Sequence, residues 1–286
     1  MLENASKRVT IVCCYNNEEE FAKLKDSVMS QTELAAVLGI ENFGNRFSSC
    51  AKALNSVLNS IETPYVIFSH QDILLTDRGM LETFTNQLEG LGKFDILGVA
   101  GAVKNGTDSL VYTNIYHGID DSRCKPGIRI VDGDGQETVT PIEVESIDEC
   151  FFGAATELFR ENPFDEEICD AWHLYAVEYS LFVRSKGGRV FSSGVELWHK
   201  SKGNLTPDFF STLCLLAKKY GAKERYITTT CAHIETDPVF IRFYQDYHKK
   251  DEQLRWFIKE SQDKQASVER LLVTGRELEG EKDRLQ

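Results

Sequence analysis

The chain has 286 residues, 42% of them hydrophobic and 27% charged, and its formal net charge is −13. This length allows one large globular domain with an appendage, and the negative charge argues against nucleic acid as the main partner, because phosphate-backbone binding needs clustered Lys and Arg. Without a run of about eighteen apolar residues or an apolar signal core, the chain is expected to be cytoplasmic and to reach a membrane only peripherally. The eight cysteines are scattered without a Cys-x-x-Cys pair, so we expect buried, reduced thiols.

The first part of the chain alternates patterns typical of strands with patterns typical of helices. Residues 9–14 form a continuous apolar and β-branched run, and Asn16 and Asn17 then precede three glutamates that suit the positive end of a helix. The alternation continues with a helix to about residue 30, a strand over 34–40, an amphipathic helix over 45–61 and a strand that ends at His70. It predicts an α/β fold with a mainly parallel, doubly wound sheet.

The middle of the chain is less regular. Residues 97–103 have the pattern of a small-residue strand. Asp132-Gly133-Asp134-Gly135 begins like a calcium loop with Glu143 at its twelfth position, but Glu137 stands where an EF-hand requires Gly. Because the flanking residues 128–131 and 139–144 resemble strands, this segment is predicted to be a β-hairpin turn.

The last part of the chain is predicted to be helical. Residues 209–220 form a helix that stops at Gly221, and Pro238 opens another segment. A heptad runs from Leu254 to Leu285 with six of its ten core positions apolar, which indicates a weak coiled coil, with a lone surface helix as the alternative. We therefore expect a main domain over residues 1–225 and a helical extension over 226–286 that is a candidate surface for homo-oligomer formation.

The strand pattern over residues 65–69 ends abruptly in His70-Gln71-Asp72. In open α/β sheets, ligands bind outside the carboxyl ends of the strands. His70 and Asp72 are two residues apart, so on an extended chain their side chains share a face and are placed to bind one ion. A strand followed by a polar turn is the alternative interpretation.

Further segments follow in a set order in the second half of the chain. They are Asn162-Pro163-Phe164-Asp165-Glu166, then residues 170–175, then residues 178–188 and finally Leu197-Trp198-His199-Lys200. Together with His70-Gln71-Asp72, this order resembles the family-two glycosyltransferases over residues 8–204, in particular a branch whose metal motif reads His-Gln-Asp instead of Asp-x-Asp. The resemblance implies a three-layer α/β/α domain that transfers a sugar from a nucleotide-diphosphate donor to a hydroxyl of a saccharide or glycolipid acceptor, with inversion.

The resemblance also implies a divalent metal held by His70, Asp72 and His199. Asp72 matches the second acidic position of Asp-x-Asp, and His70 replaces the first. In related transferases a late histidine completes the metal shell, which here is His199; the alternative is a histidine that merely packs beside Trp198. Hard oxygen ligands suit Mg²⁺ or Mn²⁺, and imidazole favours Mn²⁺.

A general base is implied for the acceptor hydroxyl. Related inverting enzymes carry an Asp or Glu at the start of a helix that continues into Leu, Arg and Gly, and that register points to Glu178. The family's acidic doublet is absent, however, because Val177 precedes Glu178. Asp170 and His173 are the competing candidates, since they lie beside Trp172, where an acceptor sugar could stack.

For the nucleotide sugar, the resemblance points to the ends of the first strands and to the segment before Cys150. Tyr15 and Asn17 are candidates for the base and ribose, and Glu41 is similar to an acidic position that often pairs with a pyrimidine. Asp148 and Glu149 occupy the segment that contacts donor or acceptor in the family. The full set of predicted donor-binding residues is Tyr15, Asn17, Glu41, Asn55, Gln71 and Asp148.

Two other functions fit parts of the pattern. A degenerate transferase fold that serves as a binding or scaffolding module on a coiled coil is favoured by the missing acidic doublet and by His70 in place of an aspartate. The joint presence of His70, Asp72, His199 and Glu178 argues against it. A sugar nucleotidyltransferase is disfavoured because no glycine-rich loop with Lys or Arg follows the first strand.

Overall fold

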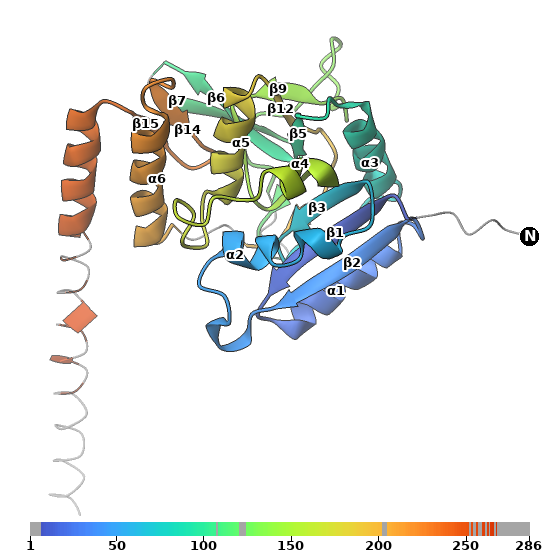
Figure 1. Ribbon diagram of the computed structural model, residues 1–286, viewed down its shortest axis with the longest axis horizontal. Helices are drawn as coiled ribbons and strands as arrows, with labels where there is room; N and C mark the ends of the chain where they lie inside the picture. The colour runs from blue at the N-terminus through green and yellow to red at the C-terminus, as the bar shows by residue number, and fades with distance from the viewer. Residues whose placement is uncertain are drawn as a thin grey trace, which may run out of the picture. The chain divides into compact units, whose positions relative to one another are not determined.

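A computed structural model describes residues 7–106, 108–119, 124–201 and 205–251, together with single positions between 253 and 267. The chain divides into two compact units, Met1–Pro238 and Val239–Gln286. The first unit contains a large sheet between layers of helices (Figure 1). Within the described residues every cysteine is a free thiol, and most are buried, as expected.

In the described part of the chain, a seven-stranded sheet forms the centre of the first unit. Its strands, in spatial order, are β2 (Ala35–Glu41), β1 (Val9–Tyr15), β3 (Tyr65–Ser69), β11 (Phe151–Ala155), β5 (Ile96–Gly98), β12 (Val190–Ser192) and β9 (Ile142–Val144). β1 pairs in parallel with β2 and β3, and β5 with β12. β11 is antiparallel to both of its neighbours, and β9 is antiparallel to β12. The mainly parallel α/β sheet predicted from the sequence is confirmed.

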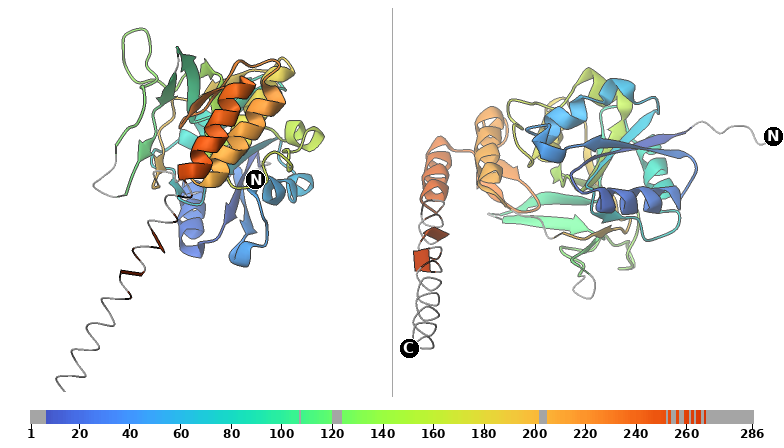
Figure 2. Two further views of the ribbon diagram at one scale, coloured as in Figure 1. Left: turned by 90° about the vertical axis from the view of Figure 1, so that its left-hand side faces the viewer. Right: turned by 90° about the horizontal axis from the view of Figure 1, so that it is seen from below.

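Helices cover both faces of this sheet. They are α1 (Glu18–Met29) and α3 (Met80–Gly90) on one face, and α2 (Cys50–Asn55), α4 (Thr156–Glu161) and α5 (Tyr175–Ser185) on the other. Side chains alternate along a strand, so β1 sends Ile11 to the α1 and α3 side and Val12 to the opposite side. The two resulting cores establish the expected three-layer α/β/α architecture (Figure 2).

The start of α1 follows the sequence pattern closely. The side chain of Asn17 accepts hydrogen bonds from the backbone N–H groups of Glu19 and Glu20 and so caps the helix. The acidic first turn lies at the positive end of the helix dipole.

Three smaller sheets complete the first unit among the described residues. One consists of β10 (Ser146–Ile147), β6 (Ala100–Asn105) and β7 (Asp108–Thr113), and a second of β4 (Ile73–Leu74), β13 (Trp198–His199) and β8 (Tyr116–His117). The third is a hairpin of β14 (Tyr226–Thr228) and β15 (His233–Glu235), which follows α6 (Pro207–Tyr220).

Two predicted elements differ from the structure. The helix expected over 45–61 is confined to α2 and is flanked by the 3₁₀ turns η1 (Phe43–Asn45) and η2 (Leu58–Ser60). It starts late because the Ser49 hydroxyl caps the backbone N–H of Lys52. The strand expected over 97–103 is split at Val99, so that β5 stays in the main sheet and β6 leaves it for the second sheet.

The segment 132–135 is a turn, as predicted. The Asp132 carboxylate accepts hydrogen bonds from the backbone N–H groups of Asp134 and Gln136, and Val131 pairs with Glu137 across the turn. The flanking strands are shorter than expected, since only β9 forms in the segment 139–144.

The second unit is helical over residues 239–251. No described helix is long and apolar enough to cross a lipid bilayer. Residues 268–286 and several earlier positions of the predicted coiled coil lie outside the described residues. The β14–β15 hairpin, which lies beyond the predicted domain boundary at residue 225, belongs to the first unit.

Candidate functional site

The His70-Gln71-Asp72 segment lies between β3 and β4, at the carboxyl end of a central strand. The backbone N–H of His70 donates to the Cys150 carbonyl at 2.9 Å, and the N–H of Lys200 donates to the Asp72 carbonyl at 3.2 Å. β13 pairs with β4, which places His199 opposite Ile73. Short strands far apart in the sequence therefore bring His70, Asp72 and His199 together, as the sequence predicted.

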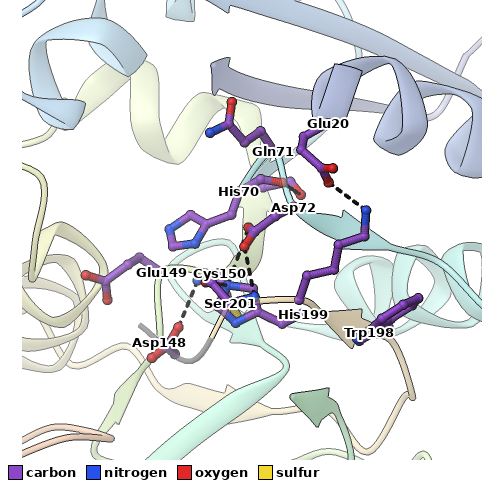
Figure 3. A network of polar contacts seen from close by, with 12 residues as sticks. Glu20, His70, Gln71, Asp72, Asp148, Glu149, Cys150, Trp198, His199 and Ser201 are labelled. Atoms are coloured by element: carbon purple, nitrogen blue, oxygen red, sulfur yellow. Dashed lines mark hydrogen bonds and ion pairs between the residues drawn. The ribbon is translucent and has the colours of Figure 1, made fainter. Parts of the chain in front are cut away.

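These three side chains form a compact donor set (Figure 3). One ligand atom from each lies within 4.8 Å of the others, and Asp72 Oδ1 is 3.5 Å from His199 Nε2. Ser201 supports both partners: its N–H donates to Asp72 Oδ2 at 3.1 Å, and its hydroxyl is hydrogen-bonded to His199 Nε2 at 3.0 Å. Two imidazoles and a carboxylate are a donor set that suits a divalent transition metal such as Mn²⁺.

The electrostatics of the cluster favour the protonation states that a metal requires. Burial, together with the neighbouring His199, lowers the pKa of His70 to about 4, so its imidazole is neutral near pH 7. Although burial opposes ionisation of Asp72, the contacts with His199 hold its pKa well below the usual range. His199 is 4% exposed, and its Nδ1 is buried without a hydrogen-bond partner among the described residues. Asp72 is thus an ionised carboxylate between two imidazoles, and the Nδ1 of His199 has no hydrogen-bond partner among the described residues. This combination of groups fits a cation site.

An open cleft adjoins the His70-Gln71-Asp72 segment at the carboxyl ends of β1 and β2. Gln71 connects the His70-Gln71-Asp72 segment to the β1–α1 loop beside the cleft. Its side-chain oxygen accepts from the backbone N–H groups of Asn16 and Asn17, both at 3.0 Å, and its amide nitrogen donates to Asn16 Oδ1. The side chains around the cleft are uncharged and rich in amides and aromatic rings. They are Cys14, Tyr15, Asn16, Asn42, Asn45, Gln71 and Trp172.

The predicted donor-binding residues are distributed unevenly around this cleft. Tyr15 and Gln71 line it, and the Tyr15 hydroxyl donates to Glu41 at 3.3 Å. Asn17 is occupied as the cap of α1. Asn55 does not line the cleft, because its amide is hydrogen-bonded to the backbone of Phe164 and to the Glu166 carboxylate.

Two consecutive carboxylates, Asp148 and Glu149, precede Cys150, whose backbone carbonyl accepts from the N–H of His70 (Figure 3). Asp148 accepts from the backbone N–H of Cys150 at 3.0 Å and from the Thr230 hydroxyl at 2.7 Å. Glu149 accepts from the backbone N–H of Leu174 at 2.8 Å. Burial and the charge of Asp148 raise the pKa of Glu149 to about 8, so the pair contains one ionised carboxylate and one that titrates near neutral pH.

Comparison with known proteins identifies the family. Residues 10–204 match the family described as "Glycosyltransferase like family". The chain belongs to this family. The chain is 27% identical over 160 residues to "ATP synthase subunits region ORF 6" of Fuscovulum blasticum, an alignment that covers 54% of this chain and 59% of the relative.

Two solved structures align with about three quarters of the chain. A crystal structure of GalNAc-T7 with UDP, GalNAc and Mn²⁺ aligns with 76% of this chain and 48% of its own chain, at 10% identity and a TM-score of 0.55. Staphylococcus aureus TarS aligns with 74% of this chain and 39% of its own chain, at 12% identity and a TM-score of 0.46. This chain thus spans less than two thirds of the length of each relative, and the likeness to GalNAc-T7 shows a common fold.

The three predicted catalytic residues lie outside the His70, Asp72 and His199 cluster. Glu178 is 2% exposed, and its Oε1 accepts from Lys219 Nζ at 2.6 Å and from the Tyr220 hydroxyl at 2.7 Å, so this carboxylate connects α5 to α6. Asp170 is exposed. His173 is hydrogen-bonded to the Thr206 hydroxyl at 3.0 Å and packs edge-on against Phe209.

His117 and Tyr175 lie near His199 and His70, respectively, and were not predicted from the sequence. His117 pairs in register with His199, and their ring centroids are 5.0 Å apart. The Tyr175 hydroxyl, at the start of α5, lies 3.4 Å from His70 Nε2. The position of His117 in a two-residue strand gives no periodic signal, and Thr230 follows the segment that matches the glycosyltransferase family.

Proposed function

We propose that this glycosyltransferase uses a divalent metal to transfer a sugar from a nucleotide diphosphate to a hydroxyl of a saccharide or glycolipid, with inversion. The observation that carries the proposal is the juxtaposition of three groups at one edge of the sheet. These are the His70, Asp72 and His199 donor set, the uncharged cleft beside it, and the Asp148 and Glu149 carboxylates. Each matches a separate requirement of glycosyl transfer: leaving-group stabilisation, donor binding and proton removal.

Mn²⁺ or Mg²⁺ bound by His70, Asp72 and His199 would neutralise the diphosphate leaving group. The protein provides a neutral His70 imidazole, an ionised Asp72 and the Ser201 contacts that orient Asp72 and His199. Gln71 fixes the β1–α1 loop against the metal-binding segment, so the cleft and the donor set keep one relative position. Tyr15, Asn16 and Asn42 line the part of the cleft that suits the nucleoside.

We propose Glu149, and not Glu178, as the general base. A base must lie near the reacting centre and needs a carboxylate that is free to take a proton. The Lys219 ammonium and the Tyr220 hydroxyl engage Glu178, whereas the Glu149 carboxylate lies close enough to Asp148 to interact with its charge and accepts a hydrogen bond from the backbone N–H of Leu174. Its pKa of about 8 is close to the ideal for general-base catalysis near neutral pH.

In this scheme the Glu149 carboxylate takes the proton of the acceptor hydroxyl as the acceptor oxygen forms a bond to the anomeric carbon. The bond from that carbon to the diphosphate oxygen breaks, and its electron pair leaves with the nucleoside diphosphate. One displacement without a covalent enzyme intermediate inverts the anomeric configuration.

The test is a donor panel, beginning with UDP-sugars because the similarly folded GalNAc-T7 is known with UDP and Mn²⁺. Release of nucleoside diphosphate is measured with Mn²⁺ and with EDTA, and the anomer of the product is assigned by NMR. We expect metal-dependent turnover and an inverted product. A protein that binds nucleotide sugars but never turns them over would favour the binding-module alternative.

A further inference from the structure

The β14–β15 hairpin reaches the candidate active site from a part of the chain that follows the family-matching segment 10–204. It is attached to the second sheet of the first unit. The Ser146 hydroxyl donates to the Thr228 carbonyl at 2.5 Å, and the Lys104 ammonium lies 3.6 Å from the ring centroid of Tyr226. The hairpin therefore has a defined position next to Asp148.

The turn of this hairpin is held by its own hydrogen bonds. The Thr229 hydroxyl oxygen accepts from the backbone N–H groups of Cys231 at 3.1 Å and Ala232 at 2.8 Å, and the N–H of Thr229 donates to the Ala232 carbonyl at 2.8 Å. Thr229 is 1% exposed. This closed turn holds the backbone at Thr230, and the hydrogen bond from its hydroxyl to Asp148 directs the side chain toward that carboxylate.

Thr230 donates its hydroxyl hydrogen to Asp148 Oδ2, while the backbone N–H of Cys150 donates to Oδ1. Donors on both oxygens fix the plane of the carboxylate and favour its ionised form. A carboxylate has about four acceptor positions, so Asp148 retains capacity for further donors. Hydroxyl groups of a sugar are such donors.

On the basis of the proposed transferase function, we propose that Thr230 is a positioning residue that holds Asp148 to accept hydrogen bonds from hydroxyl groups of the transferred sugar. The sugar subsite then lies beside the β14–β15 hairpin, and the nucleoside subsite lies in the cleft around Tyr15 and Gln71. The two parts of the donor consequently depend on different residues.

The test compares Thr230→Val, which keeps the shape but lacks the hydroxyl, with Thr230→Ser, which keeps the hydroxyl. In the full chain with Mn²⁺, we expect Thr230→Val to lower kcat/KM for the nucleotide sugar about 10- to 100-fold, the scale of losing a hydrogen bond to a charged group. The affinity for the nucleoside diphosphate, which lacks the sugar, should stay within about 2-fold, and Thr230→Ser should stay within about 3-fold of the wild type on both measures.

Ser146→Ala is the structural control, because it removes the bond that attaches the hairpin without touching Asp148. It should lower Tm, and it should reduce the ratio of nucleotide-sugar to nucleoside-diphosphate affinity far less than Thr230→Val does, because the Lys104–Tyr226 contact still holds the hairpin. The role of Thr230 would be overturned, and the proposed function would stand, if the wild type is active and Thr230→Val has a normal kcat/KM. Equal losses of nucleotide-sugar and nucleoside-diphosphate affinity in Thr230→Val would have the same meaning. A folded wild type that neither binds nor turns over any nucleotide sugar would overturn the proposed function, and this inference with it.

Discussion

Replacing Glu178 by Gln separates a structural role of this residue from a catalytic one. The Glu178 carboxylate is buried and holds both Lys219 and Tyr220 of α6. A hydrogen bond to a charged group contributes about 1.5–3 kcal/mol, and breaking a buried ion pair costs about 3–5 kcal/mol. Lys219 keeps a second partner in Asp165 at 2.7 Å, and glutamine keeps one acceptor oxygen, so we expect a loss of roughly 2–4 kcal/mol in the free energy of unfolding.

At about 2–4 °C per kcal/mol for a domain of this size, the loss corresponds to a fall in Tm of roughly 4–16 °C. Glu157→Gln is the matched control, since Glu157 forms an exposed pair with Arg160 and should change stability by less than about 0.5 kcal/mol. Urea denaturation gives the free energy, and kcat is measured below the transition, where we expect it to stay within a few-fold of the wild type. A Glu178→Gln protein with unchanged stability and a loss in kcat on the order of 10²-fold would show that Glu178 is the base.

The other expectations concern the base and the C-terminal unit. Activity should rise with pH up to about 8, because Glu149 must lose its proton, and Glu149→Gln should lower kcat by about 10²-fold and abolish this rise; an unchanged pH profile would exclude Glu149. Since the folded-state pKa of this carboxyl is raised above 4.5, its contribution to stability is full below pH 4.5 and is lost as the pH rises through about 8, so urea denaturation should give a flatter pH dependence for Glu149→Gln. Removing residues 239–286 should leave the first unit folded and lower the oligomeric state in light scattering, whereas two monomeric proteins would indicate a lone surface helix.

The sequence predicted that His70, Asp72 and His199 lie close together, because strand ends in an α/β sheet converge at one edge. His70 and Asp72 follow a strand with a strong apolar pattern, and His199 belongs to a motif in the expected order. His117 was not predicted, because it reaches the cluster through a two-residue strand that pairs with β13, 82 positions away. Such short pairings depend on tertiary packing and have no local periodicity.

The surroundings of Glu178 and Glu149 likewise depend on tertiary packing and leave no local pattern in the sequence. The register of the motif points to Glu178, but the partners of that carboxylate are on α6, and a sequence pattern within α5 carries no information about them. The segment that carries Asp148 and Glu149 lies at the carboxyl end of β3 because β11 runs antiparallel beside β3. The hydrophobic pattern indicates that a strand is present but does not give its direction.

Thermal unfolding with a nucleoside diphosphate tests most directly the proposed metal site and its binding of the nucleotide diphosphate. At a ligand concentration of about 100 times Kd, binding stabilises the folded state by about 2.7 kcal/mol, or roughly 5–11 °C in Tm. We expect this shift with Mn²⁺ and not with EDTA. Asp72→Asn should lose it, while Asp77→Asn, which changes an exposed aspartate outside the cluster, should keep it. Equal stabilisation with Mn²⁺ and EDTA, or a full shift in Asp72→Asn, would contradict the account.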